Sequence, residues 1–179
     1  DEIEAKLGPV DVLINNAGFA SFGHFATETK LEDELQMMQL NMVTLTLLTK
    51  LFVKPMVERR SGQIMNVAST ASFQPGPLMA VYYATKSYVL SFSEAIAREL
   101  NGTGVTVTAL CPGPTESGFQ ERAAMQDSKL ISNATMPLMT SVAVAEQAYK
   151  ALIADKTIII PGFMNKVGSL LPRFVPRGM

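Results

Sequence analysis

Apolar residues recur along this chain at two different spacings, and these predict strands that alternate with helices. Short β-branched runs at 10–14, 63–68, 104–110 and 157–160 predict four strands, the first of them apolar on both faces as in a helix-covered parallel sheet. Apolar positions near helical spacing predict helices over 31–57, 80–100 and 141–153, the last with Ser141 as its N-cap. Strands alternating with helices indicate an α/β fold with a parallel sheet and right-handed crossovers.

Composition narrows the class of protein. The 179 residues are 47% hydrophobic and 17% charged, which suits one sizeable core, and no linker or repeat divides the chain. A net charge of −1 does not favour nucleic acid as a partner. The single cysteine, Cys111, excludes an internal disulfide and a multi-cysteine metal site, and it fits a reducing, cytoplasmic compartment. No segment approaches the ~20 apolar residues expected of a membrane span.

Three of the predicted strands run into loops of unusual composition. These loops are residues 15–18 (Asn-Asn-Ala-Gly), 68–72 (Ala-Ser-Thr-Ala-Ser) and 111–115 (Cys-Pro-Gly-Pro-Thr). Ligands of open α/β sheets bind beyond the carboxyl ends of the strands. We therefore expect the three loops to converge on one cleft.

Four side chains near these loops could carry acid–base chemistry. Tyr82 and Lys86 are four residues apart on a predicted helix, so a lysine ammonium there would favour the phenolate and lower the pKa of the tyrosine. Ser69 ends a strand and could hydrogen-bond the same substrate oxygen, and mid-helix Asn41 could hold a proton-relay water. Taken singly, each also has an ordinary explanation: a surface pair, a turn serine and a satisfied helix asparagine.

Taken together, in this order and spacing, these motifs make the sequence resemble the short-chain dehydrogenase/reductase family over nearly the whole chain. The residues that carry the resemblance are Asn15 to Gly18, Asn41, Ser69, Tyr82 to Lys86, and Pro112 to Ser117. The resemblance implies a doubly wound, Rossmann-like sheet. It also implies reversible hydride transfer between NAD or NADP and a carbonyl or secondary alcohol of a small, apolar substrate.

The resemblance also assigns roles to individual residues. Tyr82 would be the catalytic acid/base, Lys86 would lower its pKa and hold the nicotinamide ribose, Ser69 would polarise the substrate carbonyl, and Asn41 would anchor a water. The cofactor would be bound by these same two residues Tyr82 and Lys86, and by Asn16, Ala17, Gly18, Pro112, Gly113, Thr115 and Ser117. Ser117 stands where the family usually has threonine.

One family feature is missing from the sequence. The family opens with a Gly-rich turn of the form T-G-x-x-x-G-x-G that cradles the pyrophosphate. This chain contains neither that turn nor the strands that precede the family's fourth strand. Residues 1–179 therefore resemble a single partial domain that begins at the family's fourth strand. We expect residues 12–14 to form an exposed sheet edge, and we expect the chain alone to bind a dinucleotide poorly.

Several alternatives stay open at this point. A non-catalytic dinucleotide-binding sensor or scaffold of the same fold, or an inert fragment, competes with the enzyme, although a sensor has no need of Ser69, Tyr82 and Lys86 together. A sugar-nucleotide epimerase is disfavoured by the residues at 15–18. The expected partners are a small molecule and a second copy of the chain. A membrane surface, through the basic residues after Asp155, is the less favoured partner.

Overall fold

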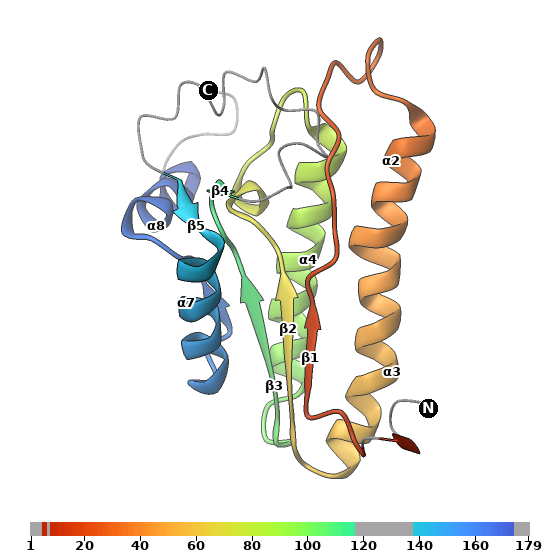
Figure 1. Ribbon diagram of the computed structural model, residues 1–179, viewed down its shortest axis with the longest axis vertical. Helices are drawn as coiled ribbons and strands as arrows, with labels where there is room; N and C mark the ends of the chain where they lie inside the picture. The colour runs from red at the N-terminus through yellow and green to blue at the C-terminus, as the bar shows by residue number, and fades with distance from the viewer. Residues whose placement is uncertain (1–4, 7, 117–137, 174–179) are drawn as a thin grey trace.

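A parallel sheet lies at the centre of the computed structural model, which describes residues 5–6, 8–116 and 138–173. Its strands run parallel in the order β1-β2-β3-β6 (Figure 1). The strands of this sheet are β1 (Val12–Asn15), β2 (Gly62–Val67), β3 (Val105–Leu110) and β6 (Ile158–Ile159). The four predicted strands are thus confirmed, with bounds that differ by one or two residues. Strands β4 (Thr115–Glu116) and β5 (Met139–Thr140) form a separate two-stranded ladder.

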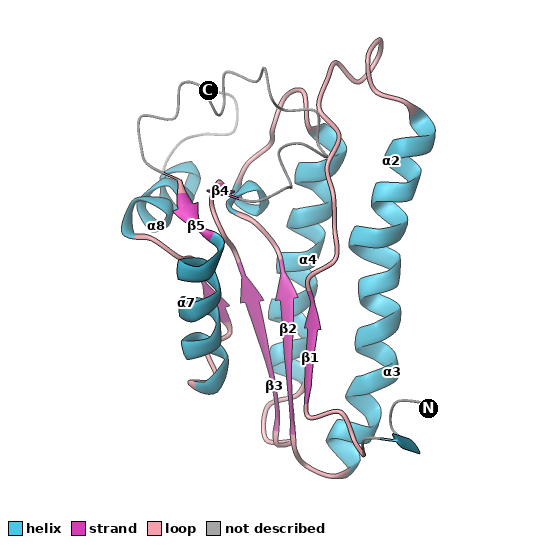
Figure 2. Cartoon of the chain, viewed as in Figure 1, coloured by secondary structure: helices cyan, strands magenta, loops and turns pink. Residues whose placement is uncertain are grey.

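Helices connect these strands and cover them (Figure 2). The helical segments are α2 (Leu31–Met38), the π-helix η1 (Gln39–Thr44), α3 (Leu45–Glu58), the 3-10 turn η2 (Thr70–Phe73), α4 (Ala80–Glu99), α7 (Ser141–Ile153), α8 (Phe163–Leu170) and the 3-10 turn η3 (Leu171–Arg173). The predicted helix over 141–153 is confirmed, but its cap is not Ser141. The Thr140 hydroxyl accepts from the Ala143 amide at 3.2 Å, and Ser141 instead donates to the Glu116 carbonyl.

The sheet is covered on both faces, as a doubly wound fold requires. Met65 and Leu110 pack under α7 in a cluster with Val144 and Leu152. Residues that alternate with these along the strands, such as Ile64 and Val107, pack under α3 and α4. Helices on opposite faces of parallel strands confirm the predicted fold class.

The outer strand β1 is covered on one face only. Leu13 packs with the residues under α3, and the side chain of Asn15 is buried. Val12 and Ile14 are 42% and 55% exposed, so the expectation that this strand is buried on both faces is wrong for the part of the chain described. The expected apolar edge is confirmed, because β1 pairs with β2 alone among the described strands.

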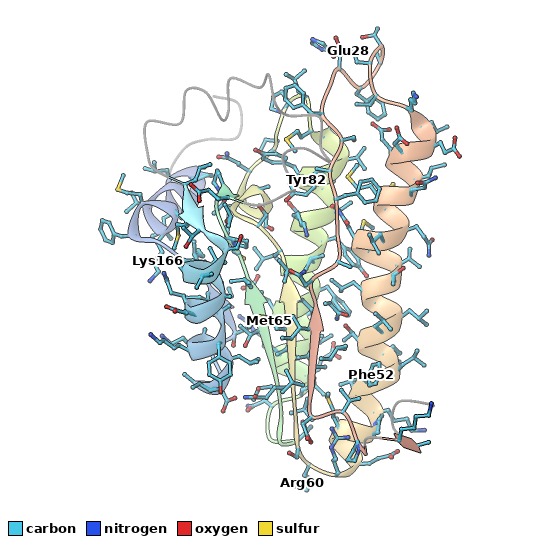
Figure 3. The ribbon with its side chains drawn as sticks, in the orientation of Figure 1. Glu28, Phe52, Arg60, Met65, Tyr82 and Lys166 are labelled. Carbon is cyan, nitrogen blue, oxygen red and sulfur yellow. The ribbon has the colours of Figure 1, made fainter. Side chains whose placement is uncertain are left out.

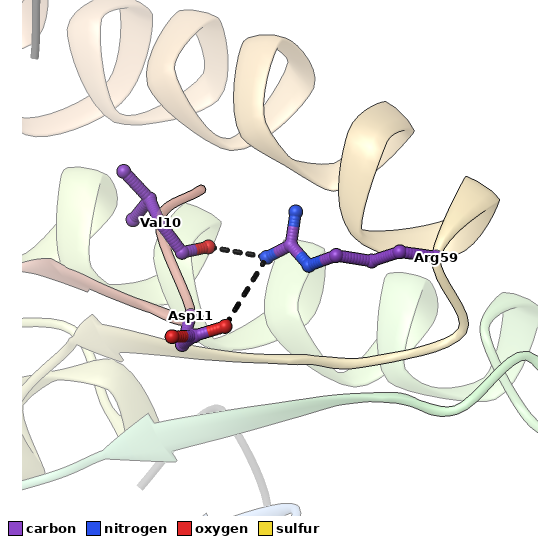
Figure 4. Close-up of polar contacts among 3 residues, drawn as sticks. All are labelled: Val10, Asp11 and Arg59. Carbon is purple, nitrogen blue, oxygen red and sulfur yellow. Dashed lines mark hydrogen bonds and ion pairs between the residues drawn. The ribbon is translucent and has the colours of Figure 1, made fainter. Parts of the chain in front are cut away.

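The start of β1 is tied to the end of α3 through Arg59 (Figure 4). The guanidinium Nη2 of Arg59 donates to the Val10 carbonyl and lies 4.0 Å from Asp11 Oδ1. Since the Asp11 side chain is 77% exposed, its ion pair adds little. The bond to the Val10 carbonyl therefore contributes more than the ion pair to holding the start of β1 against the end of α3.

A single continuous helix runs from Leu31 to Glu58, and it includes the π-helical turn. By length and composition alone it is the one helix in the described ranges that could cross a membrane, which the interrupted apolar run did not predict. One of its faces nevertheless packs on the sheet and α4, through Met37, Asn41, Leu45, Thr49 and Met56. We therefore treat it as a covering helix of the sheet.

Candidate active site

The loops after β2 and β3 meet at the carboxyl edge of the sheet, as expected. The amide of Ala68 donates to the Leu110 carbonyl at 2.7 Å, and the amide of Thr70 donates to the Pro112 carbonyl at 2.9 Å. Tyr82 lies at this same end of the sheet, near the start of α4 (Figure 3). The three elements β2, β3 and α4 therefore form a common site.

Tyr82 is buried, with 8% of its surface exposed. Burial raises the pKa of its hydroxyl to about 12, an effect that a hydrogen bond with Ser69 partly opposes and the neighbouring Tyr83 reinforces. Tyr82 and Tyr83 contact each other edge to face, with centroids 6.1 Å apart. At neutral pH the Tyr82 hydroxyl is thus protonated and is a proton donor.

Lys86 lies one turn further along α4 and is also buried. Its Nζ donates to the Val67 carbonyl at 2.8 Å and lies 5.8 Å from the centroid of the Tyr82 ring. Loss of hydration lowers the pKa of this ammonium to about 8. Lys86 therefore carries a charge below about pH 8 and loses it as the pH rises further.

The spacing of these two residues predicted their proximity but not the pKa of the tyrosine. We expected the ammonium to lower the pKa of Tyr82, whereas in the structure the desolvation of a buried phenol outweighs every other effect. The ammonium lies near the face of the ring and bonds to a backbone carbonyl. In this form of the protein, burial therefore sets the pKa of Tyr82.

Ser69 is positioned by the turn that follows β2. Its hydroxyl caps the 3-10 turn η2, accepting from the Ala71 amide at 3.1 Å. The same hydroxyl is 3.5 Å from the Pro112 carbonyl, at the limit of a hydrogen bond. Ser69 thus has the capping role that serines favour and also lies beside Tyr82.

Asn41 occupies the π-helical turn and is 1% exposed. Its amide bonds the backbone of Phe19 twice: Oδ1 accepts from the Phe19 amide at 3.2 Å, and Nδ2 donates to the Phe19 carbonyl at 3.0 Å. Nδ2 also donates to Thr85 Oγ1 at 3.2 Å. The asparagine side chain thus holds the loop after β1 against α4, a contact that sequence reasoning did not anticipate.

The loop after β1 comes close to both Asn41 and Lys86 at Gly18. A Cβ added to Gly18 would lie 2.9 Å from Asn41 Oδ1 and 3.5 Å from Lys86 Nζ, so a larger residue would crowd this point. The preceding residues Asn16 and Ala17 are exposed. The structure therefore brings Gly18 to the tyrosine–lysine pair and leaves Asn16 and Ala17 accessible on the same loop.

The loop after β3 forms another side of the site. Pro112, Gly113 and Thr115 are all partly buried, and Thr115 Oγ1 donates to the Gly113 carbonyl at 2.9 Å. Ser117, predicted as a further cofactor-binding residue, lies outside the described residues. Pro112 is joined to the turn that carries Ser69 through the Thr70 amide.

Two other residues take part in this arrangement but were not predicted to. Thr85 links Asn41 to the Tyr82 carbonyl, to which its hydroxyl donates at 2.8 Å. Asn165 of α8 lies directly against Gly113. One feature of the sequence indicated a role for Thr85, which is a polar residue in the middle of a predicted helix. Nothing in the sequence linked Asn165 to residue 113.

Two surface hollows of about 430 and 620 Å³ lie away from these residues, beside the end of α4 and along α2. Within the described ranges, no three His, Cys, Asp or Glu side chains are grouped closely enough to hold a metal ion.

The doubly wound sheet with this cluster at its carboxyl edge places the chain in the Rossmann-like class of α/β proteins. Within that class the chain belongs to the short-chain dehydrogenase family, since the family model described as "short chain dehydrogenase" matches residues 1–128.

Individual relatives agree with this assignment. The chain is 38% identical over 117 residues to a short chain dehydrogenase of Pseudocercospora fijiensis, covering 65% of this chain and 38% of that protein. It is 32% identical over 182 residues to the ketoacyl reductase HetN of Nostoc sp., covering 96% and 61% respectively. The chain thus spans between about two fifths and three fifths of the length of these curated relatives.

A solved structure shows the same fold. A short-chain dehydrogenase from Sphingobium yanoikuyae in complex with NADPH superimposes with a TM-score of 0.76 at 26% identity, covering 94% of this chain and 67% of that one.

Proposed function

We propose that the protein containing this chain is an oxidoreductase that transfers a hydride between a nicotinamide dinucleotide and a carbonyl or secondary alcohol. The observation that carries this proposal is the buried Tyr82 hydroxyl, hydrogen-bonded with Ser69 and one helical turn from the buried Lys86. A protein that only binds a dinucleotide has no need of a protonated phenol beside a hydroxyl and an ammonium. The enzyme is therefore the better account of these residues.

The residues around Gly18 and Pro112 fit the nicotinamide end of such a cofactor. The loop after β1 presents the exposed Asn16 and Ala17, and Gly18 leaves the space that a side chain would fill. Tyr82, Lys86, Gly113 and Thr115 would border the ring and its ribose. The sequence holds no Gly-rich turn for the pyrophosphate, so these residues account for that end of the cofactor only. The NADPH complex of the Sphingobium enzyme makes NADPH the first cofactor to test.

Proton donation by Tyr82 is the step that these residues support. When bound, the dinucleotide supplies or accepts the hydride. Tyr82, with its pKa raised to about 12, holds a proton for the substrate oxygen throughout the physiological range. Ser69 lies 3.5 Å from the Pro112 carbonyl and is hydrogen-bonded with Tyr82, and when substrate binds its hydroxyl would turn from these partners to the substrate oxygen.

Lys86 acts on Tyr82 through its charge. The bond to the Val67 carbonyl fixes the ammonium near the tyrosine ring, where a cation stabilises negative charge developing on the phenol oxygen. Because burial lowers the pKa of Lys86 to about 8, this help is complete only below that pH. We therefore expect proton transfer to weaken as the pH rises through about 8.

A small, apolar carbonyl compound is the substrate class that we propose. One relative is named a ketoacyl reductase, which supports a carbonyl group as the reacting centre. The end of the site near Gly113 is bordered by Asn165 of α8, a helix that also carries the exposed Phe163 and Met164. Exposed apolar side chains beside the site favour an apolar substrate over a charged one.

Replacing each of the two neighbouring tyrosines separately tests this function. Tyr82→Phe removes one hydroxyl and should lower kcat for NADPH-dependent ketone reduction by roughly 10²–10⁴-fold, while the Kd for NADPH stays within about twofold. Tyr83→Phe is the matched control, because it removes a hydroxyl from the adjacent ring, and it should keep most of the activity. Turnover by Tyr82→Phe equal to that of the parent protein would refute the proposal.

We also infer that a second copy of the chain covers the outer face of the helix Leu31–Glu58. This outer face carries exposed large apolar residues along its length: Leu31, Leu35, Met38, Val43, Leu47 and Leu51. An exposed apolar stripe of this length is typical of an interface between proteins. The helix is long and straight enough in Figure 1 to pair with its own copy, which can bury the same residues on both sides.

A further inference from the structure

The Pro112–Gly113 loop is held by contacts with two elements. From the turn after β2, the Thr70 amide donates to the Pro112 carbonyl at 2.9 Å. From α8, the side chain of Asn165 lies directly against Gly113. A Cβ added to Gly113 would be 2.4 Å from Asn165 Oδ1 and 2.6 Å from both Cγ and Nδ2.

Gly113 is required for space rather than for its backbone conformation. The φ of Gly113 does not lie in the left-handed region, so an alanine could adopt the same backbone. The glycine is nevertheless needed, because Asn165 fills the position of any side chain there. The side-chain amide of Asn165 can therefore occupy its position only because Gly113 has no side chain.

The carboxamide of Asn165 is fixed in one orientation. Its Nδ2 donates to the Pro161 carbonyl at 2.8 Å and lies 3.9 Å from Met139 Sδ. The Ser169 hydroxyl donates to the backbone carbonyl of Asn165 at 2.8 Å, within the helix. Both Oδ1 and Nδ2 of the side-chain amide border Gly113, at 2.4 and 2.6 Å from the position of an added Cβ. The start of α8 thus presents a polar group, anchored to the Pro161 carbonyl, to the loop.

A second series of contacts connects Asn165 with the Pro112–Gly113 loop. Thr115 Oγ1 donates to the Gly113 carbonyl, and β4, which begins at Thr115, pairs with β5, which begins at Met139. Met139 contacts Asn165 in turn, so α8, β5, β4 and the loop form a closed ring of contacts. A shift of Asn165 would therefore be transmitted to the loop from two directions.

We propose that Asn165 is a positioning residue that sets the conformation of the Pro112–Gly113 loop for binding the nicotinamide ring. In this proposal Asn165 acts through its contact with Gly113. The cofactor part of this inference rests on the proposed function. The coupling between Asn165 and Gly113 does not, and can be measured without a cofactor.

A double-mutant cycle in the 179-residue chain tests the coupling. Gly113→Ala should lower the melting temperature and speed hydrogen exchange of the amides of residues 111, 113, 115 and 116 by at least roughly tenfold, which corresponds to ~1.4 kcal/mol. Asn165→Ala removes the colliding atoms, so adding Gly113→Ala to it should cost much less than in the parent chain. Met164→Ala, on the exposed side of the same helix, is the matched control and should not relieve the collision. Additive effects of Gly113→Ala and Asn165→Ala would overturn the proposal.

Cofactor measurements in the enzyme test the positioning role. Asn165→Ala should raise the Kd and KM for NADPH roughly tenfold while leaving the pH dependence of kcat unchanged, because Tyr82 and Lys86 keep their surroundings. An unchanged KM for NADPH would overturn the positioning role even where the coupling to Gly113 is present. If the parent enzyme binds neither NADPH nor NADH, the proposed function fails and the cofactor part of this inference fails with it. In that case the mutant cycle still decides the Asn165–Gly113 contact.

Discussion

The two faces of the helix Leu31–Glu58 differ in burial and in the kind of contact that their side chains make. The inner face is buried and includes polar side chains with specific partners: Asn41 bonds the Phe19 backbone, and Thr49 accepts from Asn15 at 3.0 Å. The outer face is apolar and exposed at Leu35, Leu47 and further residues along the same stripe. The inner face positions the site by hydrogen bonds, which are directional. The outer face offers apolar surface, whose burial is not directional. Substitutions on the two faces should therefore affect different properties.

The largest effect is expected on the inner face, at Asn41. Asn41→Ala removes two hydrogen bonds to the Phe19 backbone and one to Thr85, and each lost bond contributes about 0.5–1.5 kcal/mol to stability. We expect the free energy of unfolding, measured by urea denaturation, to fall by about 2–4 kcal/mol. Activity should fall as well, because the loop that carries Gly18 loses its anchor.

Thr44→Ala is the matched control for this variant. Thr44 lies in the same π-helical turn, but it is only partly buried, and its hydroxyl bonds the Gln39 carbonyl within the helix. Its replacement should change the free energy of unfolding by less than about 0.5 kcal/mol. Equal losses at Asn41 and Thr44 would show that the turn itself is sensitive, rather than the bonds to Phe19.

A smaller effect on folding, and a larger one on assembly, is expected on the outer face. Leu47→Glu places a charge at a position that is 55% exposed, so the unfolding of the isolated chain should change by less than about 1 kcal/mol. In sedimentation velocity the variant should be monomeric at concentrations at which the parent protein self-associates. Val142→Glu, which adds the same charge at an exposed apolar position on α7, is the matched control.

Two outcomes would contradict the interface between copies. One is a parent protein that is monomeric at every concentration. The other is a parent protein that binds phospholipid vesicles through Leu47 without self-associating, which would assign the outer face to a membrane. Either result would leave the account of the inner face unchanged.

The sequence predicted the parts of the site that depend on local spacing. Tyr82 and Lys86 share a helix face because they are one turn apart, and Ser69 joins them because parallel strands end at one edge of the sheet. The parallel sheet, the helices that cover it and the exposed edge at Ile14 were also predicted from these patterns, whereas the strand order comes from the structure.

Contacts between distant segments could not be predicted in the same way. The Asn41–Thr85 bond joins residues 44 positions apart, and it depends on a π-helical turn that the periodicity of apolar residues does not distinguish from an ordinary one. The contact of Asn165 with Gly113 depends on how α8 folds back onto the loop. The pKa of Tyr82 was expected to fall, whereas it rises because desolvation depends on the surrounding atoms rather than on the spacing to Lys86.

The protonation of Tyr82 is the most direct test of the account, because proton donation by this hydroxyl is its central claim. Tyrosine Cζ resonances of the ¹³C-labelled chain can be followed by NMR from pH 8 to 11, with Tyr82→Phe and Tyr83→Phe used for assignment. An unperturbed phenol is half ionised near pH 10. With its pKa raised to about 12, Tyr82 should remain largely protonated at the end of the titration. A midpoint for Tyr82 at or below that of an unperturbed phenol would contradict the account.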